Sequence, residues 1–326
     1  MVVRGDDVIF IVATHSFLLE VELDSTWRVK RYEVLRREHH YGIAIVNNSR
    51  VFAIKRGDNQ LDLPQLTEYD VQPSLVLRRT RLFGEHFDDV HQISNANNGL
   101  YIANTGYNSL FFTSTDGQVE HRHMFGNIIE DVNHVNSVYP CGNQVFALLH
   151  NRSRTDGEIT VLHHDLTSGF SLVQQLSLSH RRVHNIFIDG RHLCYKISPT
   201  GEFVVVDLVK ERISKTLSLP GHTKGLSVMQ DYYVIGFSDR ASRDERFTSK
   251  GHLAIVDRRT WNQIATVDLN FASLRFPILL ATSMKYPVSR KKSQVKQPLT
   301  LFTLASLPYV FQAGTLCMKL EEDMRS

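Results

Sequence analysis

Three stretches of the sequence share one short pattern: Gly157-Glu-Ile-Thr-Val-Leu-His-His-Asp165, Gly201-Glu-Phe-Val-Val-Val-Asp207 and Gly251-His-Leu-Ala-Ile-Val-Asp257. Each begins at a glycine, continues with β-branched or aliphatic residues and ends at an aspartate. Such residues favour strands, and aspartate favours the turn after a strand, so each stretch is predicted to be a strand closed by a turn. The glycines lie 44 and 50 residues apart, a spacing typical of one four-stranded propeller blade.

A second pattern precedes the first and consists of two strands joined by a short polar turn, a hairpin. It occurs four times without gaps, at shifts of 45, 48 and 40 residues, beginning at His91, Asn136, His184 and Lys224. A looser copy begins at Tyr41 and has a loop one residue longer. Five repeat units are therefore predicted to begin near residues 41, 91, 136, 184 and 224.

The two ends of the chain supply a sixth unit. Residues 8–13, 17–23 and 27–35 predict three strands with no hairpin before them, and the apolar run 274–282 follows the fifth unit. Pairing this run with the N-terminal strands closes the ring and leaves no exposed sheet edge. The sequence thus predicts an all-β fold, a six-bladed β-propeller formed by residues 1–284 as one domain, whose last blade is closed by N- and C-terminal strands.

Residues 285–326 have a different composition. A basic linker that contains Arg290-Lys-Lys292 precedes two apolar runs, 299–304 and 310–318. These runs are predicted strands that either thicken the closing blade, form part of a seventh blade or pack outside the ring. The sequence leaves the three alternatives open.

One blade carries a family resemblance. The run Gly99-Leu-Tyr-Ile-Ala-Asn-Thr-Gly-Tyr-Asn-Ser-Leu110 resembles the blade pattern of NHL-repeat and SMP-30/strictosidine-synthase-like six-bladed propellers. The likeness is good over this blade and diffuse over about residues 40–270. Proteins of this kind are often calcium-binding hydrolases or lactonases that hold the metal with a glutamate and a few Asn and Asp side chains. That ligand set has no residue-by-residue counterpart here, so the resemblance implies the fold and no site residues.

The repeat register places polar residues from distant parts of the chain around the propeller axis. The innermost strand of each blade lines the axial channel, and alternate residues of a strand point to the same side. The predicted channel residues form two stacked layers, with Tyr41, His91, Asn136, His184 and Lys224 in one and His39, Asp89, His134, Arg182 and His222 in the other. The sequence therefore predicts a His-rich axial pocket.

Four of these histidines, His91, His134, His184 and His222, are candidate ligands for a divalent transition metal, because neutral imidazole suits Fe, Zn or Cu. Tyr41, Asp89, Asn136 and Lys224 are predicted to line the same pocket, and Asp131 is near enough to hydrogen-bond the imidazoles. In the alternative interpretation the histidines are structural and bond only to the protein, since Lys224 and Arg182 would repel a cation.

Two functions fit this pattern. In the first, the pocket binds a small molecule, as an enzyme that uses a divalent metal or as a site without one. In the second, the propeller is a non-catalytic platform that docks a protein partner with its loops. The motifs GxSxG, GxxxxGK[ST], HExxH and GxGxxG do not occur in the sequence, so serine-hydrolase, P-loop, zincin and Rossmann chemistry lack their signatures. The long insert 238–250 either covers a channel mouth or is a charged surface loop.

Composition narrows the partners and the compartment. The 326 residues carry a formal net charge of +3, with basic residues scattered among acidic ones, which predicts no nucleic-acid partner. The sequence lacks an apolar run of the roughly 18 residues that cross a membrane. Three cysteines without CxxC spacing argue for reduced thiols in a cytoplasmic protein. The pair His163-His164, and His121 on an outer strand, are predicted to face solvent.

Overall fold

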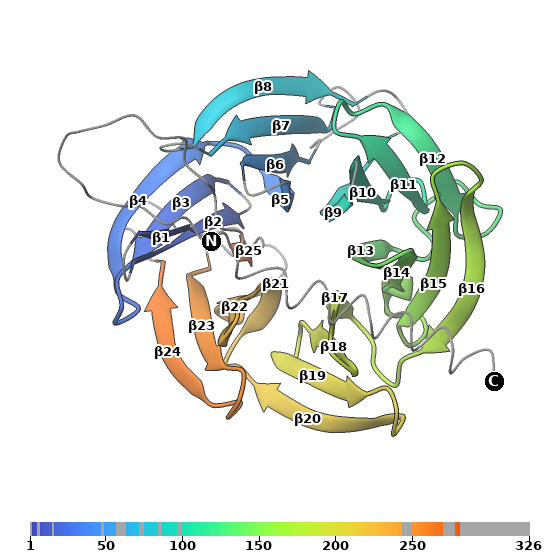
Figure 1. The fold of residues 1–326 in the computed structure, drawn as a ribbon. Helices are drawn as coiled ribbons and strands as arrows, with labels where there is room; N and C mark the ends of the chain where they lie inside the picture. The colour runs from blue at the N-terminus through green and yellow to red at the C-terminus, as the bar shows by residue number, and fades with distance from the viewer. Residues whose placement is uncertain are drawn as a thin grey trace, which may run out of the picture.

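The computed structural model describes residues 2–4, 7–14, 16–46, 49–56, 63–71, 75–83, 87–96, 99–242, 245, 249–269 and 278–280. Over this part, the chain forms six antiparallel sheets arranged as blades around one axis (Figure 1). The predicted six-bladed β-propeller is confirmed. No helix among these residues is both long and apolar enough to cross a membrane.

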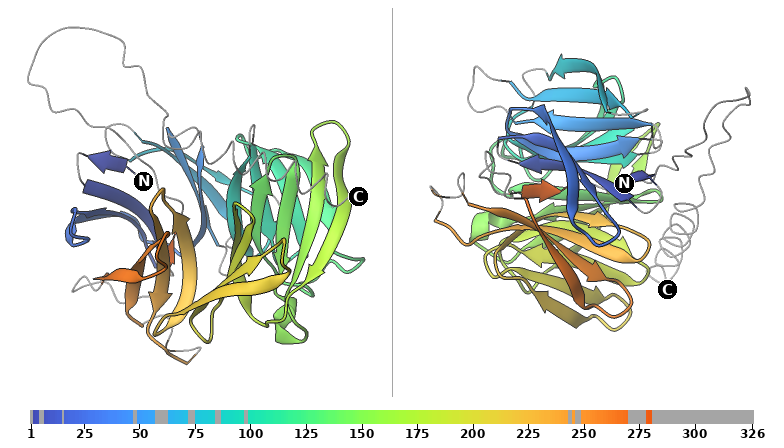
Figure 2. Two further views of the ribbon diagram at one scale, coloured as in Figure 1. Left: turned by 60° about the horizontal axis from the view of Figure 1, so that its bottom comes forward. Right: turned by 90° about the vertical axis from the view of Figure 1, so that its left-hand side faces the viewer.

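Five blades consist of four consecutive strands, and each strand pairs antiparallel with the next. Their innermost strands begin at residues 40, 90, 135, 183 and 222, within two residues of the predicted starts. Figure 2 shows the blades from the side. In chain order the strands are β5 (His40–Val46), β6 (Arg50–Lys55), β7 (Gln65–Asp70) and β8 (Val76–Leu82); β9 (Val90–Ala96), β10 (Gly99–Asn104), β11 (Ser109–Ser114) and β12 (Val119–Met124); β13 (Val135–Cys141), β14 (Gln144–Leu149), β15 (Glu158–Asp165) and β16 (Gly169–Ser177); β17 (Val183–Asp189), β18 (His192–Ile197), β19 (Glu202–Asp207) and β20 (Arg212–Ser218); β21 (His222–Val228), β22 (Tyr232–Ser238), β23 (Gly251–Asp257) and β24 (Gln263–Asp268).

The sixth blade joins the two ends of the described chain. It contains β1 (Val2–Arg4), β2 (Asp7–Thr14), β3 (Leu18–Leu23), β4 (Val29–Arg36) and β25 (Ile278–Leu280). Both β1 and β25 pair with β2, β1 opposite residues 7–9 and β25 opposite residues 12–14. The composite closing blade is therefore confirmed. The predicted strands 299–304 and 310–318, and the rest of 285–326, lie outside the described residues.

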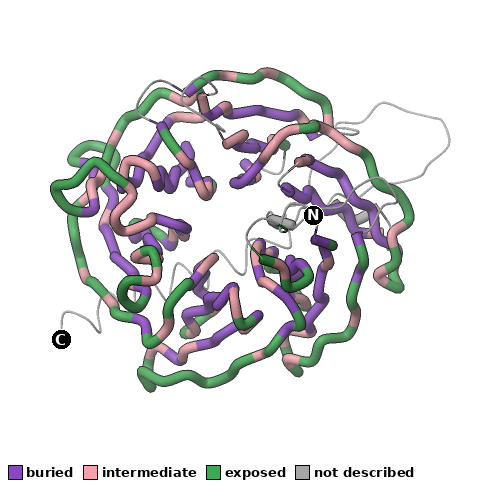
Figure 3. Tube along the Cα trace, turned by 180° about the vertical axis from the view of Figure 1, so that it is seen from behind, coloured by how far each residue is buried: buried purple, intermediate pink, exposed green. Residues whose placement is uncertain are grey.

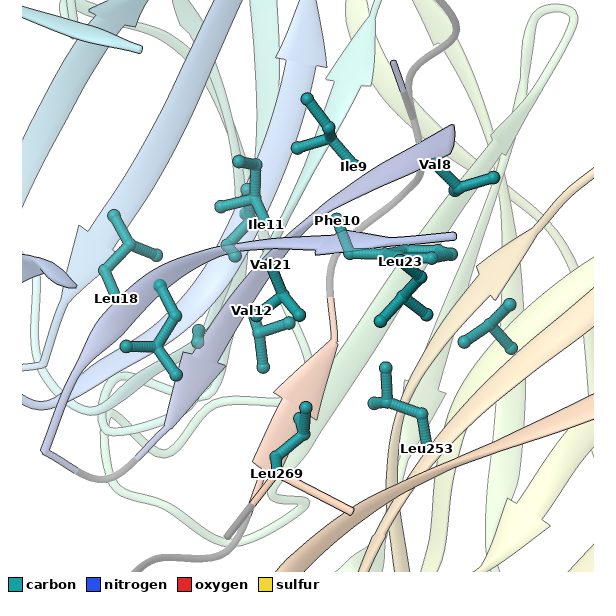
Figure 4. Packing of buried hydrophobic residues seen from close by; sticks show 14 of the residues in the cluster. Val8, Ile9, Phe10, Ile11, Val12, Leu18, Val21, Leu23, Leu253 and Leu269 are labelled. Atoms are coloured by element: carbon teal, nitrogen blue, oxygen red, sulfur yellow. The ribbon is translucent and has the colours of Figure 1, made fainter. Parts of the chain in front are cut away.

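Burial changes regularly from the axis to the rim of each blade (Figure 3). All six residues of β10 are buried, whereas no residue of β12, two strands further out, is buried. The middle strands are covered on both faces by neighbouring blades, so their runs of apolar residues supply most of the hydrophobic burial. The closing blade joins its neighbour in the same way, since Phe10 and Val12 belong to one cluster with Leu253 and Leu269 (Figure 4).

The innermost strands are irregular near their starts, and this irregularity positions side chains at the axis. In all five regular blades, the register between the first and second strands shifts within the first few residues, near Tyr41, His91, Asn136, Asn185 and Gly225. Such bulges bend a strand and redirect its side chains. The residue directly before three of these strands has a left-handed backbone, with φ of 46° at Asp89, 53° at His134 and 55° at Arg182.

Close packing explains the glycines that begin the repeated third-strand pattern. A Cβ atom at Gly157 would lie 2.2 Å from the Val183 side chain of the next blade. At Gly201, which has φ of +79°, it would lie 2.3 Å from the Leu219 carbonyl oxygen. These positions therefore require glycine because the backbone has no room for a side chain.

We expect Gly201→Ala to lower the free energy of unfolding by about 2–4 kcal/mol, because overpacking adds to the cost of a left-handed alanine. Gly190→Ala is the matched control, since Gly190 has φ of +57° and no atom within 4 Å of its added Cβ. It should cost only about 1–2 kcal/mol. Urea denaturation measures both values, and equal losses would contradict the close packing at Gly201.

Two groups of residues differ from the predictions made for them. His164 is 7% exposed rather than solvated, with its Nδ1 2.7 Å from the Tyr101 hydroxyl and its Nε2 2.9 Å from Nδ1 of His121. This chain of hydrogen bonds links two neighbouring blades. Cys194 is a buried free thiol, as predicted, but Cys141 is disulfide-bonded, which corrects the prediction of reduced thiols throughout.

His40, the first residue of β5, is a buried imidazole outside the axial pocket. Its side chain is 0% exposed, and its Nδ1 lies 2.9 Å from the Glu38 carbonyl oxygen. Burial lowers the pKa of His40 from 6.5 to about 4, because the charged form would lose its hydration.

The free energy of unfolding should therefore fall as the pH decreases from about 6.5 to about 4, since the unfolded chain binds a proton that folded His40 does not. One such imidazole contributes at most about 1.4 kcal/mol per pH unit. His40→Asn should flatten the slope by this one-proton share, as measured by urea denaturation at several pH values. A slope that His40→Asn leaves unchanged would show that His40 does not titrate in this way.

Candidate axial site

A cavity of about 910 Å³ lies on the propeller axis. Its walls come from five blades, from residues at the starts of the innermost strands and from the connections after the second strands. Seven of the eight predicted site residues line it, namely Tyr41, Asp89, His91, His134, His184, His222 and Lys224. The eighth, Asn136, is buried behind the wall, with its Oδ1 3.0 Å from Nδ1 of His184.

Aromatic rings follow one another around much of the wall. Rings from both predicted layers, together with His150, form one continuous arc. The distances between successive ring centroids are 4.8 Å from His39 to Tyr41, 5.1 Å to His91, 4.8 Å to His134, 4.9 Å to His150 and 5.2 Å to His184.

Hydrogen bonds fix the proton positions of two imidazoles in this arc. Nδ1 of His91 lies 3.0 Å from the Asp89 carbonyl oxygen, which can only accept a hydrogen bond. It also lies 2.8 Å from the Thr105 hydroxyl, which donates its own hydrogen to the Val135 carbonyl at 2.6 Å. Nδ1 of His91 must therefore carry the hydrogen, and Nε2 keeps a lone pair. The amide oxygen of Asn136 sets the same tautomer in His184.

A carboxylate fixes the third imidazole. Nδ1 of His134 lies 2.9 Å from an oxygen of Asp131, which also accepts a hydrogen bond at 2.9 Å from Nε of Arg152. Burial raises the pKa of Asp131, but the hydrogen bonds from His134 and Arg152 outweigh it and lower the pKa to about 2. Asp131 is thus ionised, and His134 also carries its hydrogen on Nδ1.

Three imidazoles of the cavity wall are uncharged at neutral pH. Burial lowers the pKa of His91 and of His184 well below the usual range, and it lowers that of His150 to about 3. Burial also raises the pKa of Asp89, although the Arg56 guanidinium 2.6 Å away opposes this. His91, His150 and His184 therefore contribute no charge to the cavity, whereas its arginines and the carboxylates paired with them do.

Several residues that line the cavity were not predicted from the sequence. These residues share one position in the repeat. Arg56, His150 and Ser198 line the cavity, and each directly follows the second strand of its blade. Thr105 holds the same place in its own blade and bonds to His91. The repeat register that identifies the first-strand residues would have identified this set if it had been carried one strand further.

The described residues do not form a metal centre with the predicted ligands. No group of three His, Cys, Asp or Glu side chains in the described part of the chain is placed to hold one ion. In His222, both ring nitrogens lie 3.3 Å from backbone carbonyl oxygens, those of Ser198 and Ala241, and a neutral imidazole can donate to only one of them. The divalent metal therefore stays a prediction from the sequence.

No protein-family model matches the chain, and no curated protein matches it by sequence. Solved structures share its fold. The periplasmic gluconolactonase of Pseudomonas aeruginosa is 13% identical, with a TM-score of 0.55 over 84% of this chain and 99% of that one. A protein of Bacteroides fragilis assigned as a 6-phosphogluconolactonase is 12% identical, with a TM-score of 0.53 over 80% and 82%. A chain of a nidogen/laminin complex is 11% identical, with a TM-score of 0.57 over 85% and 99%. These likenesses show a propeller fold that enzymes and assembly proteins share.

The hydrogen-bond pattern predicts that His91, His134 and His184 all carry a hydrogen on Nδ1 at pH 7.5. Long-range ¹H–¹⁵N correlation spectra measure this directly, with assignments from single His→Gln variants. We expect all three signals to have the pattern of the Nδ1–H tautomer. The Nε2–H pattern at any of the three would contradict the partner assigned to that residue.

Proposed function

We propose that the axial cavity binds a small molecule and that the Asp131–His134 pair acts on it as the base of a hydrolytic reaction. The observation that carries this proposal is the 2.9 Å contact between Asp131 and Nδ1 of His134, which leaves the Nε2 lone pair of a cavity-lining imidazole to accept a proton. A carboxylate that orients an imidazole in this way is the common arrangement of a general base.

The reaction that suits this pair is hydrolysis of an ester or lactone. His134 Nε2 takes a proton from a water molecule while the water oxygen attacks the carbonyl carbon. The tetrahedral intermediate then breaks its bond to the leaving oxygen, and the imidazolium returns the proton to that oxygen. Asp131 stabilises the imidazolium, and Arg152 keeps Asp131 ionised. The gluconolactonase and 6-phosphogluconolactonase named among the structures of similar fold make sugar lactones the first substrates to test.

A metal-assisted version of this reaction has one observation in its favour. His91, His134 and His184 each bond to the protein through Nδ1, as metal-ligating histidines usually do. Elemental analysis of untagged protein, against a His91→Ala plus His184→Ala control, tests it. A stoichiometric metal would add Lewis-acid chemistry, whereas its absence would leave the general-base reaction unchanged.

The second candidate function is the non-catalytic platform, and exposed apolar side chains favour it. Ile128 and Ile129 are 54% and 59% exposed in the connection that also carries Asp131. A protein partner that covers this loop would also cover one side of the cavity. In that case the histidines are structural.

A panel of sugar lactones and simple esters decides between the two functions. We expect His134→Gln and Asp131→Asn to reduce kcat/KM by about 100-fold or more, which is the usual size of a general-base contribution. His163→Gln, on β15 and outside the cavity, is the matched control and should keep full activity. Hydrolysis that both variants retain would rule out the assigned base. The absence of both turnover and ligand-induced thermal stabilisation across the panel would favour the platform.

A further inference from the structure

One side of the cavity is lined by three arginines, and only one of them is paired with a carboxylate. Arg152, Arg154 and Arg182 all line the cavity. Arg152 is engaged by Asp131, but within the described residues no carboxylate lies within ion-pair distance of Arg154 or Arg182. Arg182 is instead held by its Nε, which donates to the Ser153 hydroxyl at 3.1 Å. This contact leaves its two terminal nitrogens for a ligand.

The charge balance of the whole cavity has the same sign. Its lining contains five cationic side chains, from four arginines and Lys224, against two carboxylates, Asp89 and Asp131. Both carboxylates are already paired with arginines, Asp89 with Arg56 and Asp131 with Arg152, so neither is available to Arg154 or Arg182. The buried imidazoles of His91, His150 and His184 are neutral, so they leave this charge balance unchanged. A concave site of one sign concentrates counter-ions of the opposite sign.

The backbone around these arginines is strained. Asn151, Arg152 and Ser153 are three consecutive residues with φ of 52°, 47° and 62°, and Arg182 has φ of 55°. Each left-handed residue other than glycine costs free energy and persists only where its surroundings require it. The three consecutive left-handed residues belong to the turn that presents Arg152, Ser153 and Arg154 to the cavity, whereas Arg182 shares its left-handed backbone with Asp89 and His134 at the equivalent position of other blades.

We propose that the small molecule bound in the axial cavity carries an oxyanion, and that Arg154, Arg182 and the Ser153–Arg152 turn bind it. This inference rests on the proposed small-molecule function and names the class of its ligand. The planar guanidinium presents parallel N–H donors that match the oxygens of a phosphate or a carboxylate. The size of the cavity, about 910 Å³, suits a whole small metabolite with the oxyanion at one end and a reacting group near His134.

The test measures binding of two probes, inorganic phosphate and gluconate, by isothermal titration calorimetry at constant ionic strength. Arg182→Gln and Arg154→Gln should each raise the Kd for the bound probe by about tenfold or more, because each substitution removes a charge-assisted hydrogen bond. The matched control is Arg181→Gln. Arg181 is the neighbouring residue, is 61% exposed and pairs with Asp156 outside the cavity, so its removal should leave Kd unchanged.

The two probes separate the sources of the oxyanion. Binding of phosphate alone assigns a phosphate ester, and binding of gluconate alone assigns a carboxylate. Equal losses in all three arginine variants, or no binding of either probe, would overturn the oxyanion subsite. That failure is distinct from failure of the proposed hydrolysis, because turnover of uncharged lactones that depends on His134 can persist without any oxyanion binding.

Discussion

The pairing of β1 and β25 with one strand, β2, is the constraint on which the rest of the structure depends. It joins the two ends of the described chain in one sheet and closes the ring of blades. Without this pairing, the sixth blade would lack its innermost strands, and β2 would expose an unpaired edge to water. The axial cavity exists only inside a closed ring, because residues from β5 to β22 meet there across five blades.

Burial then determines the chemistry of the cavity. A charged imidazole loses its hydration when neighbouring blades cover it, so His91, His150 and His184 are neutral side chains. Of these, His91 and His184 have fixed hydrogen-bond partners at Nδ1. Ionised carboxylates survive only where arginines compensate them, as at Asp89 and Asp131. The result is a wall that offers lone pairs and guanidinium donors, an environment suited to a polar, negatively charged molecule and poorly suited to an uncompensated cation.

The innermost-strand residues lie around the axis because a gap-free repeat places equivalent residues at equivalent positions in each blade. Asp89, His134 and Arg182 share a register position and also a left-handed backbone. The same reasoning failed for His150 and Arg56, because it stopped at the first strand of each blade. It also misplaced His164, whose exposure depends on how closely β12 and β16 of neighbouring blades approach, a property that no pattern within one blade encodes.

By itself, the sequence determined the number of blades, their starts and the composite closing blade, because strand propensity and repeat spacing are local properties of the chain. Only the tertiary structure decided what the polar residues at the axis can do. The tautomer of His184, which Asn136 sets, and the contact between His222 and the Ser198 carbonyl both depend on a partner in another blade. The uncompensated charge of Arg154 and Arg182 likewise appears only when two blades meet at the cavity. Hydrogen bonds and ion pairs act over a few ångströms, so they are fixed only when closure of the ring brings these distant segments together.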